Sequence, residues 1–561
     1  MLKVGTVALQ GSSRGLLSPL LLFFIFYTTM SGSPAQAADV LAACGSSVAR
    51  VVSIQGNIEV LRSGSNDWTR VAKLDTLVCT GDRLRSGPQS RAALFVQPET
   101  LVRVDQNTSV TVSQTADETL VEFIQEDVVA VSASAHACGA GYFVTRFPRK
   151  FKVKTPQLNA AIEGTEFLVA LRCESTDLSV FEGKVLATSA GANVFPSQSV
   201  VSGQTLSVGG SEPPAIKLLV KPADAVQWTL YYPPLTPADA VPVADCRDVA
   251  ADNRASCLIA RAERLLRAGR VDEAQANIGD ALAVAPYSSD AKALSSIISL
   301  VKNDKVDALR LAKEAVDANL SSAPAWLALS YAQQADFKLE AALTSAKRAS
   351  DLSPSSALAL ARVAELQLSL GWIRQAEKSA QQAVAANPDE SRAHMILGFV
   401  HLAQIKVKGA GEDFERAIEL DSTDPLSRLG LGLAIIRKGN LVEGREHIEI
   451  AVALDPTNSL IRSYVGKAYY EEDQPERGQL AAEQFNLARS YDRLDPTAWL
   501  YEAIRKQTQN RSVEALDDLQ TSIELNDYRA IYRSRLLLDQ DLADRGATLG
   551  RVFSEIGRAH V

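Results

Sequence analysis

Hydrophobic positions in the first part of the chain, from residue 44 to 208, form short runs rich in valine and isoleucine. Runs such as 51–54 and 58–61 have the length of β-strands, and several runs alternate with polar positions. Turn-forming residues such as the pair Gly81-Asp82 separate them. This pattern predicts an all-β sandwich or roll over residues 44–208.

A different pattern begins at Ala255, where Ala, Leu, Glu, Lys and Arg dominate and small residues recur every 34 positions. One series consists of Ala281, Ala315, Ala349, Ala383, Ala417 and Ala451, and a second of Ala274, Ala308, Ala342, Ala376, Ala410 and Gly444. This period, with small residues where two helices approach closely, is typical of tetratricopeptide (TPR) repeats. The sequence therefore predicts an all-α TPR superhelical solenoid over residues 255–532.

The period indicates six regular units between residues 255 and 458, a seventh with an insertion near 471–478, and an eighth from Trp499. Stacked units form a concave groove that can hold a peptide or a partner helix. On the first helices of the units, the candidate groove residues are Trp326, Arg362, His394, Arg428 and Arg462. Helix packing, or a solvated helix face, is the alternative role for the same residues.

Residues 209–250 form a Pro-rich aromatic linker between the two regions. Within it, residues 226–231 read as a strand or extended segment, and we expect Trp228, Tyr231 and Tyr232 to pack on one domain. An aromatic platform for a ligand is the alternative.

Three motifs in the β-rich region resemble the FecR domain. They are Thr155-Pro156, then Gly164-Thr165-Glu166-Phe167, then Glu182-Gly183, and the run 81–110 resembles the first half of the same domain. The sequence departs from the family at Glu163, where arginine is common, so a binding role for that position is not carried over. The resemblance implies an exported sensing or binding module. We expect Gly164 and Gly183 to lie at turns or bulges where a side chain would clash.

The N-terminus has the pattern of a secretion signal over residues 1–37. Lys3 and Arg14 precede an apolar stretch, and the Ala-Gln-Ala of residues 35–37 suits cleavage after Ala37. An uncleaved anchor is the alternative. Residues 41–44 (Leu-Ala-Ala-Cys) also match a lipobox, which would attach a lipid to Cys44, but polar residues separate this sequence from the apolar stretch.

Six cysteines in an exported chain predict disulfides. We favour sequential pairs, but six cysteines allow fifteen pairings, and a redox role is the alternative. The candidates are Cys44, Cys79, Cys138, Cys173, Cys246 and Cys257.

Charge and motifs narrow the classes of function. The formal net charge of −8 argues against a nucleic-acid binder, which needs a basic surface. The chain has no phosphate-binding loop and no His-Glu-x-x-His motif, and His394 and His401 lie seven residues apart with no third ligand nearby in sequence. We therefore expect no catalytic residues, no cofactor and no metal.

The last residues, 533–561, read as an incomplete C-terminal segment. Residues 556–561 resemble an in-frame translation of a sequencing-adapter oligonucleotide, so we expect the natural chain to continue. Some similar FecR–TPR proteins carry a C-terminal outer-membrane barrel of the TonB-dependent-receptor type.

Together these features predict a non-enzymatic scaffold in the periplasm or at the outer membrane of a Gram-negative-type bacterium. Its TPR groove would bind a protein partner, and its β domain would bind an envelope glycan or a receptor component. It would touch the membrane only through a lipid anchor or a missing barrel. The alternative is the periplasmic part of a TonB-dependent transport or signalling receptor, truncated before its barrel.

Overall fold

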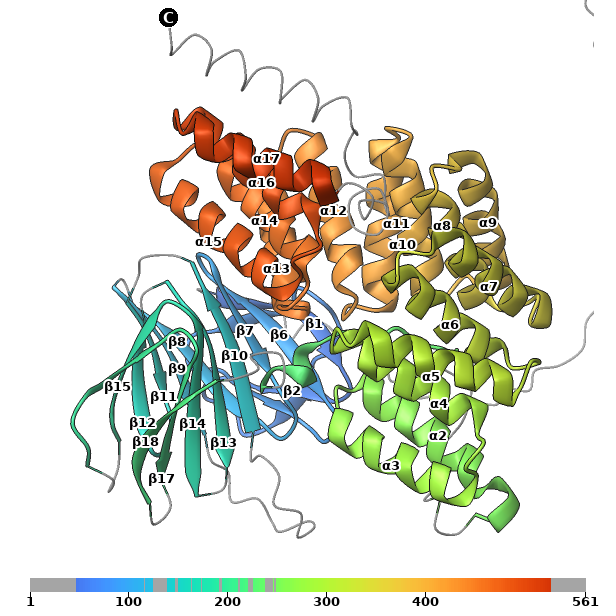
Figure 1. The fold of residues 1–561 in the computed structure, drawn as a ribbon. Coiled ribbons are helices and arrows are strands. Elements are labelled where there is room, and N and C mark those ends of the chain that lie inside the picture. Colours follow the sequence, from blue (N-terminus) through green and yellow to red (C-terminus); the bar gives the residue numbers. More distant parts are fainter. Residues whose placement is uncertain are drawn as a thin grey trace, which may run out of the picture. The chain divides into compact units, whose positions relative to one another are not determined.

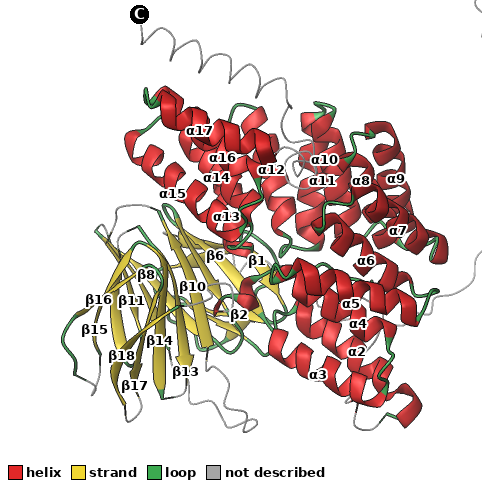
Figure 2. Ribbon diagram, in the orientation of Figure 1, coloured by secondary structure: helices red, strands yellow, loops and turns green. Residues whose placement is uncertain are grey.

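The computed structural model describes residues 47–525 except for 116, 125–138, 147–149, 163, 173, 191–193, 210–211, 220–224, 238–245 and 247–248. The N-terminal part of this range is all β and the C-terminal part is all α (Figures 1 and 2). The predicted fold class is therefore confirmed. The secretion signal at 1–37, Cys44, Cys138, Glu163, Cys173 and the segment 533–561 lie outside the described residues.

The β domain consists of two nine-stranded sheets. The first sheet has the order β18-β17-β14-β13-β10-β7-β6-β1-β4, and the second has the order β16-β15-β12-β11-β9-β8-β5-β2-β3. Neighbouring strands are antiparallel except for β9 and β11. The strands are β1 (Ser47–Gln55), β2 (Ile58–Leu61), β3 (Trp68–Arg70), β4 (Leu77–Cys79), β5 (Arg83–Ser86), β6 (Arg91–Val96), β7 (Thr100–Val104), β8 (Ser109–Gln114), β9 (Glu118–Phe123), β10 (Gly139–Thr145), β11 (Lys150–Lys154), β12 (Leu158–Ile162), β13 (Glu166–Arg172), β14 (Ser175–Glu182), β15 (Lys184–Ser189), β16 (Gln198–Val201), β17 (Gln204–Gly209) and β18 (Glu212–Leu218).

Burial distinguishes the two sheets. Strands β2 and β9 of the second sheet alternate between buried and half-buried positions, as expected of a sheet with one solvated face. In the first sheet every residue of β6, β7 and β10 is buried, so both faces of this part of the sheet are covered. One cover is the aromatic core of the β domain, where the rings of Phe143 and Phe167 stack with centroids 4.7 Å apart. The other is the helical domain.

Two features of the linker differ from the expectation. Strand β18 pairs with β17, so the sheet continues past the predicted boundary at residue 208. Residues 226–231 are not a strand, because Gln227–Thr229 forms a short 3-10 helix, η2. A hydrogen bond of 2.7 Å from the Thr229 hydroxyl to the Val226 carbonyl favours this tight turn over an extended segment.

The helical domain contains sixteen α-helices within the described residues, arranged as eight antiparallel pairs. In Figure 1 they run from green to red. The helices are α2 (Ala251–Arg267), α3 (Val271–Val284), α4 (Ser289–Val301), α5 (Lys305–Ala318), α6 (Ala323–Ala335), α7 (Leu339–Leu352), α8 (Ala357–Ser369), α9 (Ile373–Ala386), α10 (Ser391–Ala403), α11 (Val407–Leu420), α12 (Pro425–Arg437), α13 (Leu441–Leu454), α14 (Ser459–Glu471), α15 (Pro475–Tyr491), α16 (Pro496–Thr508) and α17 (Ser512–Glu524).

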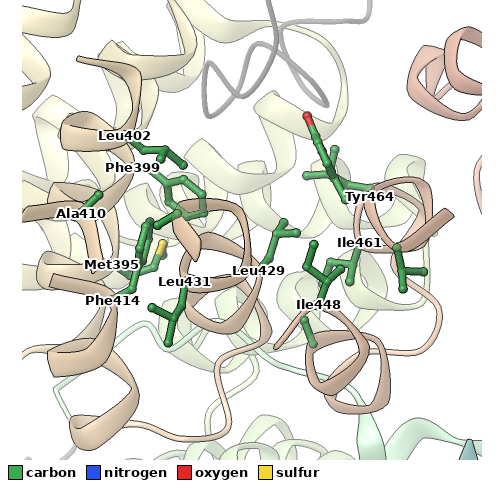
Figure 3. Close-up of a cluster of buried hydrophobic side chains, with 14 of the residues drawn as sticks. Met395, Phe399, Leu402, Ala410, Phe414, Leu429, Leu431, Ile448, Ile461 and Tyr464 are labelled. Carbon is green, nitrogen blue, oxygen red and sulfur yellow. The ribbon is translucent and has the colours of Figure 1, made fainter. Parts of the chain in front are cut away.

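The 34-residue series marks buried positions in the repeats. The alanines of the first series, from Ala281 to Ala451, have no exposed surface. Larger side chains fill the space between pairs, as in the buried cluster around Phe399, Phe414 and Tyr464 (Figure 3). The rings of Phe399 and Phe414 meet edge to face with centroids 4.8 Å apart.

The seventh unit carries the predicted insertion. Its second helix, α15, has 17 residues where α13 has 14, and it begins at Pro475, 34 positions after the first residue of α13. The buried small residues Ala481 and Ala488 lie 37 positions after Gly444 and Ala451. The three extra residues therefore form an added turn at the N-terminal end of α15.

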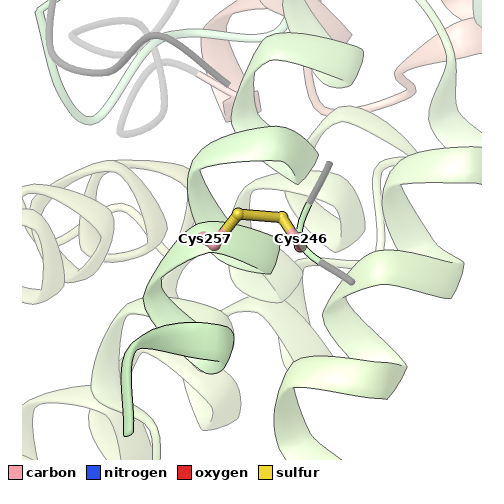
Figure 4. The surroundings of a disulfide bond; sticks show 2 residues. All are labelled: Cys246 and Cys257. Atoms are coloured by element: carbon pink, nitrogen blue, oxygen red, sulfur yellow. A yellow bond between two sulfur atoms is a disulfide. The ribbon is translucent and has the colours of Figure 1, made fainter. Parts of the chain in front are cut away.

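A disulfide joins Cys246 in the linker to Cys257 in α2 (Figure 4). It attaches the end of the linker to the first helix of the repeats. Cys79 is also disulfide-bonded, and the residue predicted to pair with it, Cys44, lies outside the described residues. None of the described helices is long and apolar enough to cross a bilayer.

Candidate functional site at the domain junction

The first sheet of the β domain packs on helix α13 through a shared apolar cluster. The strands contribute Phe95 and Tyr142, and α13 contributes Ile450, Ala453 and Leu454. All five side chains are buried. The two domains therefore share part of one hydrophobic core, which fixes where the polar groups of the junction meet.

Glu166, the variable residue of the Gly-Thr-x-Phe motif, lies fully buried beside this cluster. It accepts hydrogen bonds from the guanidinium groups of Arg462 in α14 and Arg146 after β10, and from the Tyr142 hydroxyl at 2.8 Å. Burial alone would raise the pKa of Glu166, but Arg462 and Arg146 outweigh it and hold the pKa well below its usual range. A motif carboxylate of the β domain is thus bound by an arginine of the repeats.

The second motif carboxylate, Glu182, lies directly opposite Glu166 across strands β13 and β14. Arg146 donates to Glu182 at 2.6 Å, and the side-chain amide of Gln484 in α15 lies 3.3 Å from the same carboxylate. Burial raises the pKa of Glu182 to about 7, and the negative charge of Glu166 adds to this, although Arg146 opposes it. The two carboxylates therefore face the helical domain as an unlike pair, one held ionised and one close to protonation at neutral pH.

The motif glycines allow this arrangement. Gly183 adopts φ of +77°, and a Cβ atom there would lie 2.6 Å from the Thr165 side chain. Gly164 adopts φ of +59° with open space around it. Glycine is therefore favoured at this position by the backbone conformation and not by a lack of space for a side chain.

A second ionic cluster forms around Glu99, between β6 and β7. Its carboxylate accepts hydrogen bonds from Arg445 in α13 at 2.9 Å and from Arg477 in α15 at 2.5 Å. Arg477 also pairs with Glu472 at 2.9 Å. Because Arg477 lies in the added turn of α15, the insertion in the seventh unit supplies one of the contacts to the β domain.

Two buried arginines of the sheet reach the C-terminal ends of repeat helices. Arg91 in β6 donates to the Arg267 carbonyl at the end of α2, at 2.7 Å. Arg103 in β7 donates to the carbonyls of Ala453 and Leu454 at the end of α13, at 3.1 and 3.0 Å. A cation at the C-terminus of a helix interacts favourably with the helix dipole. Burial lowers the pKa of Arg91 to about 10 and that of Arg103 to about 9.

The groove candidates divide into two groups. Arg428 and Arg462 contact the β domain, because Arg428 donates to the Val52 carbonyl in β1 and Arg462 binds Glu166. Arg362 is buried among residues of the repeats, with Glu365 at 3.0 Å and the Tyr331 ring 3.9 Å from its guanidinium carbon.

Trp326, His394 and Arg462 occupy one position of the repeat, 68 residues apart, and share a local contact. Each side chain has a nitrogen within 3.0 Å of the carbonyl oxygen six residues earlier, in the loop before its helix. This contact gives the position a structural role in addition to any role in binding.

The linker aromatics contact both domains, not one. Trp228 packs on the shared cluster of the sheet and α13, whereas Tyr232 is buried in the core of the first repeats. Tyr231 is hydrogen-bonded by Arg392 of α10. The linker is therefore part of the junction.

Sequence reasoning named Glu166 and Glu182 only as parts of motifs and did not name Arg146, Arg445 or Gln484. The signal in the sequence that could have identified Glu166 and Glu182 is that each is a charged residue at a motif position beside strand-forming residues. Among the described residues, no group of three or more His, Cys, Asp or Glu side chains is placed to hold a metal ion.

Comparison with known proteins agrees with this division of the chain. Residues 82–186 match the FecR protein family, and residues 362–425 match a tetratricopeptide repeat family. The chain combines a FecR domain with tetratricopeptide repeats. The FecR match includes Glu99, Glu166 and Glu182, so the carboxylates that bind the repeats belong to the FecR domain itself. No curated protein matches the chain significantly.

Several solved structures resemble the repeats of this FecR–TPR protein. The APC/C hetero-tetramer Cut9-Hcn1 is 18% identical over 55% of this chain and 57% of that chain, with a TM-score of 0.44. A tetratricopeptide repeat protein from Parabacteroides merdae is 17% identical over 47% of this chain and 98% of its own, with a TM-score of 0.33. YrrB, described as a TPR protein with an unusual peptide-binding site, is 21% identical over 33% and 95%, with a TM-score of 0.23.

Proposed function

We propose that this protein is a non-enzymatic scaffold of the bacterial cell envelope whose repeats bind a protein partner beside a docked FecR domain. FecR domains and TPR repeats are non-catalytic families that indicate protein interaction or signalling. FecR proteins are typically associated with the envelope, and TPR repeats generally bind proteins. The secretion signal expected over residues 1–37 supports a location in the periplasm or at the outer membrane.

One observation carries the proposal. The repeat position that binds the β domain through Arg428 and Arg462 continues into earlier units as Trp326, Leu360 and His394. Among the described residues, no strand residue hydrogen-bonds or ion-pairs with Trp326 or His394. Trp326, Leu360 and His394 are partly exposed, and we infer that the surface that binds the β domain in the sixth and seventh units binds another protein in the third to fifth.

An exposed hydrophobic surface of the β domain supports the proposal of a second contact with the envelope. Five large hydrophobic side chains are exposed on strands or loops at one edge of the two sheets: Leu186, Val194, Val201, Ile216 and Leu218. This edge includes β16 and β18. Strands β6, β7 and β10, which α13 covers, lie elsewhere in the first sheet. The proposed ligand of this domain is an envelope glycan or a receptor component.

Site-specific crosslinking in cells tests the proposal. A photoreactive amino acid at Leu360 or His394 is expected to give a discrete adduct with one envelope protein. The control position is Val306, which is 84% exposed at the start of α5 and outside the repeat position that holds Trp326 and His394. Absence of an adduct from Leu360 and His394, or the same adducts from all three positions, would contradict partner binding by this surface.

Cell fractionation tests the location. The mature chain is expected in the periplasmic or outer-membrane fraction, and recovery with cytoplasmic markers would contradict export. The alternative, the periplasmic part of a TonB-dependent transport or signalling receptor, stays a prediction, and sequencing the gene beyond the codon for Glu555 tests it.

A further inference from the structure

A cavity of about 270 Å³ lies where the sheet, the linker and the repeats meet. Its lining includes Arg103 from β7, Arg267 from the end of α2, Glu390 before α10 and Asp421 after α11. We propose that this cavity binds a small zwitterion, an amino acid or a dipeptide. The ligand carboxylate would lie against Arg103 and Arg267, and its ammonium group against Glu390 and Asp421. This inference is independent of the partner-binding surface.

The cationic side of the cavity is only partly neutralised, because Arg267 pairs with Glu263 at 3.3 Å whereas Arg103 has no counter-ion in the part of the chain that the structure describes. Arg103 makes no ion pair within the described residues, because its Nη1 donates only to carbonyl oxygens. Its buried Nε has no hydrogen-bond partner among the described residues. The nearby carboxylates are occupied, since Asp105 pairs with Arg270 and Asp455 accepts from Asn458 at 3.1 Å. A buried cation without an anion is costly, so an incoming carboxylate would be stabilised there.

The carboxylates on the acidic side of the cavity also lack counter-ions within the described residues. One oxygen of Asp421 accepts from the Thr423 backbone at 2.9 Å, and one oxygen of Glu390 accepts from the Arg392 backbone at 3.4 Å. Neither carboxylate forms an ion pair within the described part of the chain. Asp421 and Arg91 are nevertheless close enough to interact electrostatically, as are Glu390 and Arg267. Opposite charges thus line one cavity without touching, which leaves room for a ligand that carries both.

Of the other charged residues of the lining, Arg91 donates to the Gln55 side chain and the Arg267 carbonyl, and the remaining two form ion pairs. Asp389 binds Arg416 at 2.8 Å, and Arg392 binds Glu365 at 3.3 Å. The volume is that of roughly nine water molecules, below the range of about 300–1,000 Å³ typical of drug-sized ligands. An amino acid or dipeptide therefore suits the space better than an oligosaccharide or a folded partner.

The repeats themselves provide substitutions that remove the acidic side without disturbing the fold. Asp421 is equivalent to Asn319 and Asn387, and Asn387 uses its side-chain oxygen in the same backbone contact, at 3.1 Å. Glu390 is equivalent to Ser322 and to the other helix-capping serines Ser288 and Ser356. The double variant Glu390→Ser/Asp421→Asn is therefore expected to fold. The matched control, Glu340→Gln/Glu415→Gln, removes two exposed carboxylates of the repeats.

Calorimetric titration of the mature chain tests the inference. The probes are the twenty amino acids and alanyl-alanine, each with its N-acetyl and its C-terminal amide derivative. At least one probe is expected to bind with Kd below about 1 mM, and both derivatives at least tenfold more weakly. The double variant should lose at least tenfold in affinity and the control variant nothing. No binding at about 10 mM, or binding that neither derivative weakens, would overturn the proposal whatever the variants do.

Discussion

At the scale of single residues, the junction depends on a few buried charges that are satisfied only when both domains are present. Arg462 and Glu166 have no exposed side-chain surface, and they lie 296 positions apart in the sequence. Removing one member of a buried ion pair leaves the other charged and without water, which costs more than the pair contributes when intact. The stability of this protein should therefore be sensitive to single substitutions here.

Arg462→Met is expected to lower the free energy of unfolding by about 3–5 kcal/mol, because Glu166 would keep only Arg146 and Tyr142 as partners. Urea denaturation followed by circular dichroism measures the change. The control is Arg416→Met, which removes ion pairs to Asp389 and Glu419 on the surface and should cost no more than about 1 kcal/mol. Equal losses in the two variants would show that the buried network does not stabilise the junction.

Glu182 gives the junction a dependence on pH. Burial raises its pKa from an ordinary value of 4.5 to about 7, so the folded chain keeps a proton that the unfolded chain releases in this interval. The contribution of Glu182 to stability is therefore fully present below about pH 4.5 and falls as the pH rises to about 7. Glu166 acts in the opposite direction, since its lowered pKa contributes stability that is lost in acid.

Glu182→Gln mimics the protonated side chain at every pH. The stability of the natural chain relative to this variant should fall by at most about 3 kcal/mol between pH 5 and pH 8. Unfolding free energies of both proteins at several pH values provide the measurement. A difference that stays constant, or that rises with pH, would contradict the raised pKa.

At the scale of elements, the turn between the two helices of each unit keeps one backbone conformation although the residue at its key position varies. The residue two positions after the end of the first helix has positive φ in all eight described units. Glycine occupies this position in only three units, at Gly269, Gly371 and Gly439. The others use Asn303, Phe337, Ile405, Asp473 and Asn510. Packing of the helix pair imposes the left-handed conformation even where the residue disfavours it.

Close helix contact explains why Gly444 replaces alanine in the second series of small residues. A Cβ atom on Gly444 would lie 2.6 Å from the Gly432 carbonyl oxygen and 2.5 Å from Ile436. Gly444→Ala should therefore lower the free energy of unfolding by about 1–3 kcal/mol through overpacking. Gly279→Ala in α3 has open space around it and should raise stability by up to about 1 kcal/mol. Thermal unfolding of both variants measures the two effects separately: the close backbone contact at Gly444 and helix propensity at Gly279. A Gly444→Ala variant more stable than the natural chain would contradict the close contact.

The two domains and their internal order could be predicted from the sequence because they depend on local and periodic patterns. The alternation of strands and the spacing of alanines reveal elements and repeat length directly. The three-residue insertion was also predictable, since it interrupts the period. Its contact through Arg477 with Glu99 was not, because that contact joins residues 378 positions apart and depends on how the domains dock.

The linker shows most clearly which part of the fold could not be predicted from the sequence. Its apolar and aromatic residues favour an extended segment on local grounds, yet residues 227–229 form a short 3-10 helix. The carbonyls of this turn accept hydrogen bonds from Arg91 and Arg103 of the sheet, while Tyr232 is buried among the repeats. The local hydrogen bond from Thr229 to Val226 favours this turn, and the contacts with both domains add to it, but a sequence read segment by segment does not contain those contacts.

At the scale of the whole molecule, the shared apolar cluster joins the folding of the FecR domain to that of the repeats. Helix α13 belongs to both cores, since Ile448 is buried among the repeats and Ile450 against the sheet. An interface that buries apolar side chains and satisfies ionic groups of both partners makes separate unfolding unfavourable. The natural chain should therefore unfold in one cooperative transition in a calorimeter.

Ile450→Asn places a polar side chain in the shared cluster while leaving the repeat core intact. It should weaken docking by about 2–4 kcal/mol and divide the single transition into two, one for each domain. The control in the same helix is Val442→Asn, at a residue that is 54% exposed and outside the shared cluster, and it should keep one transition. Two transitions already present in the natural chain would show that the domains fold independently. One transition in Ile450→Asn with an unchanged midpoint would show that α13 does not couple them. The expected result would mean that the FecR domain and the repeats respond together to whatever binds either one.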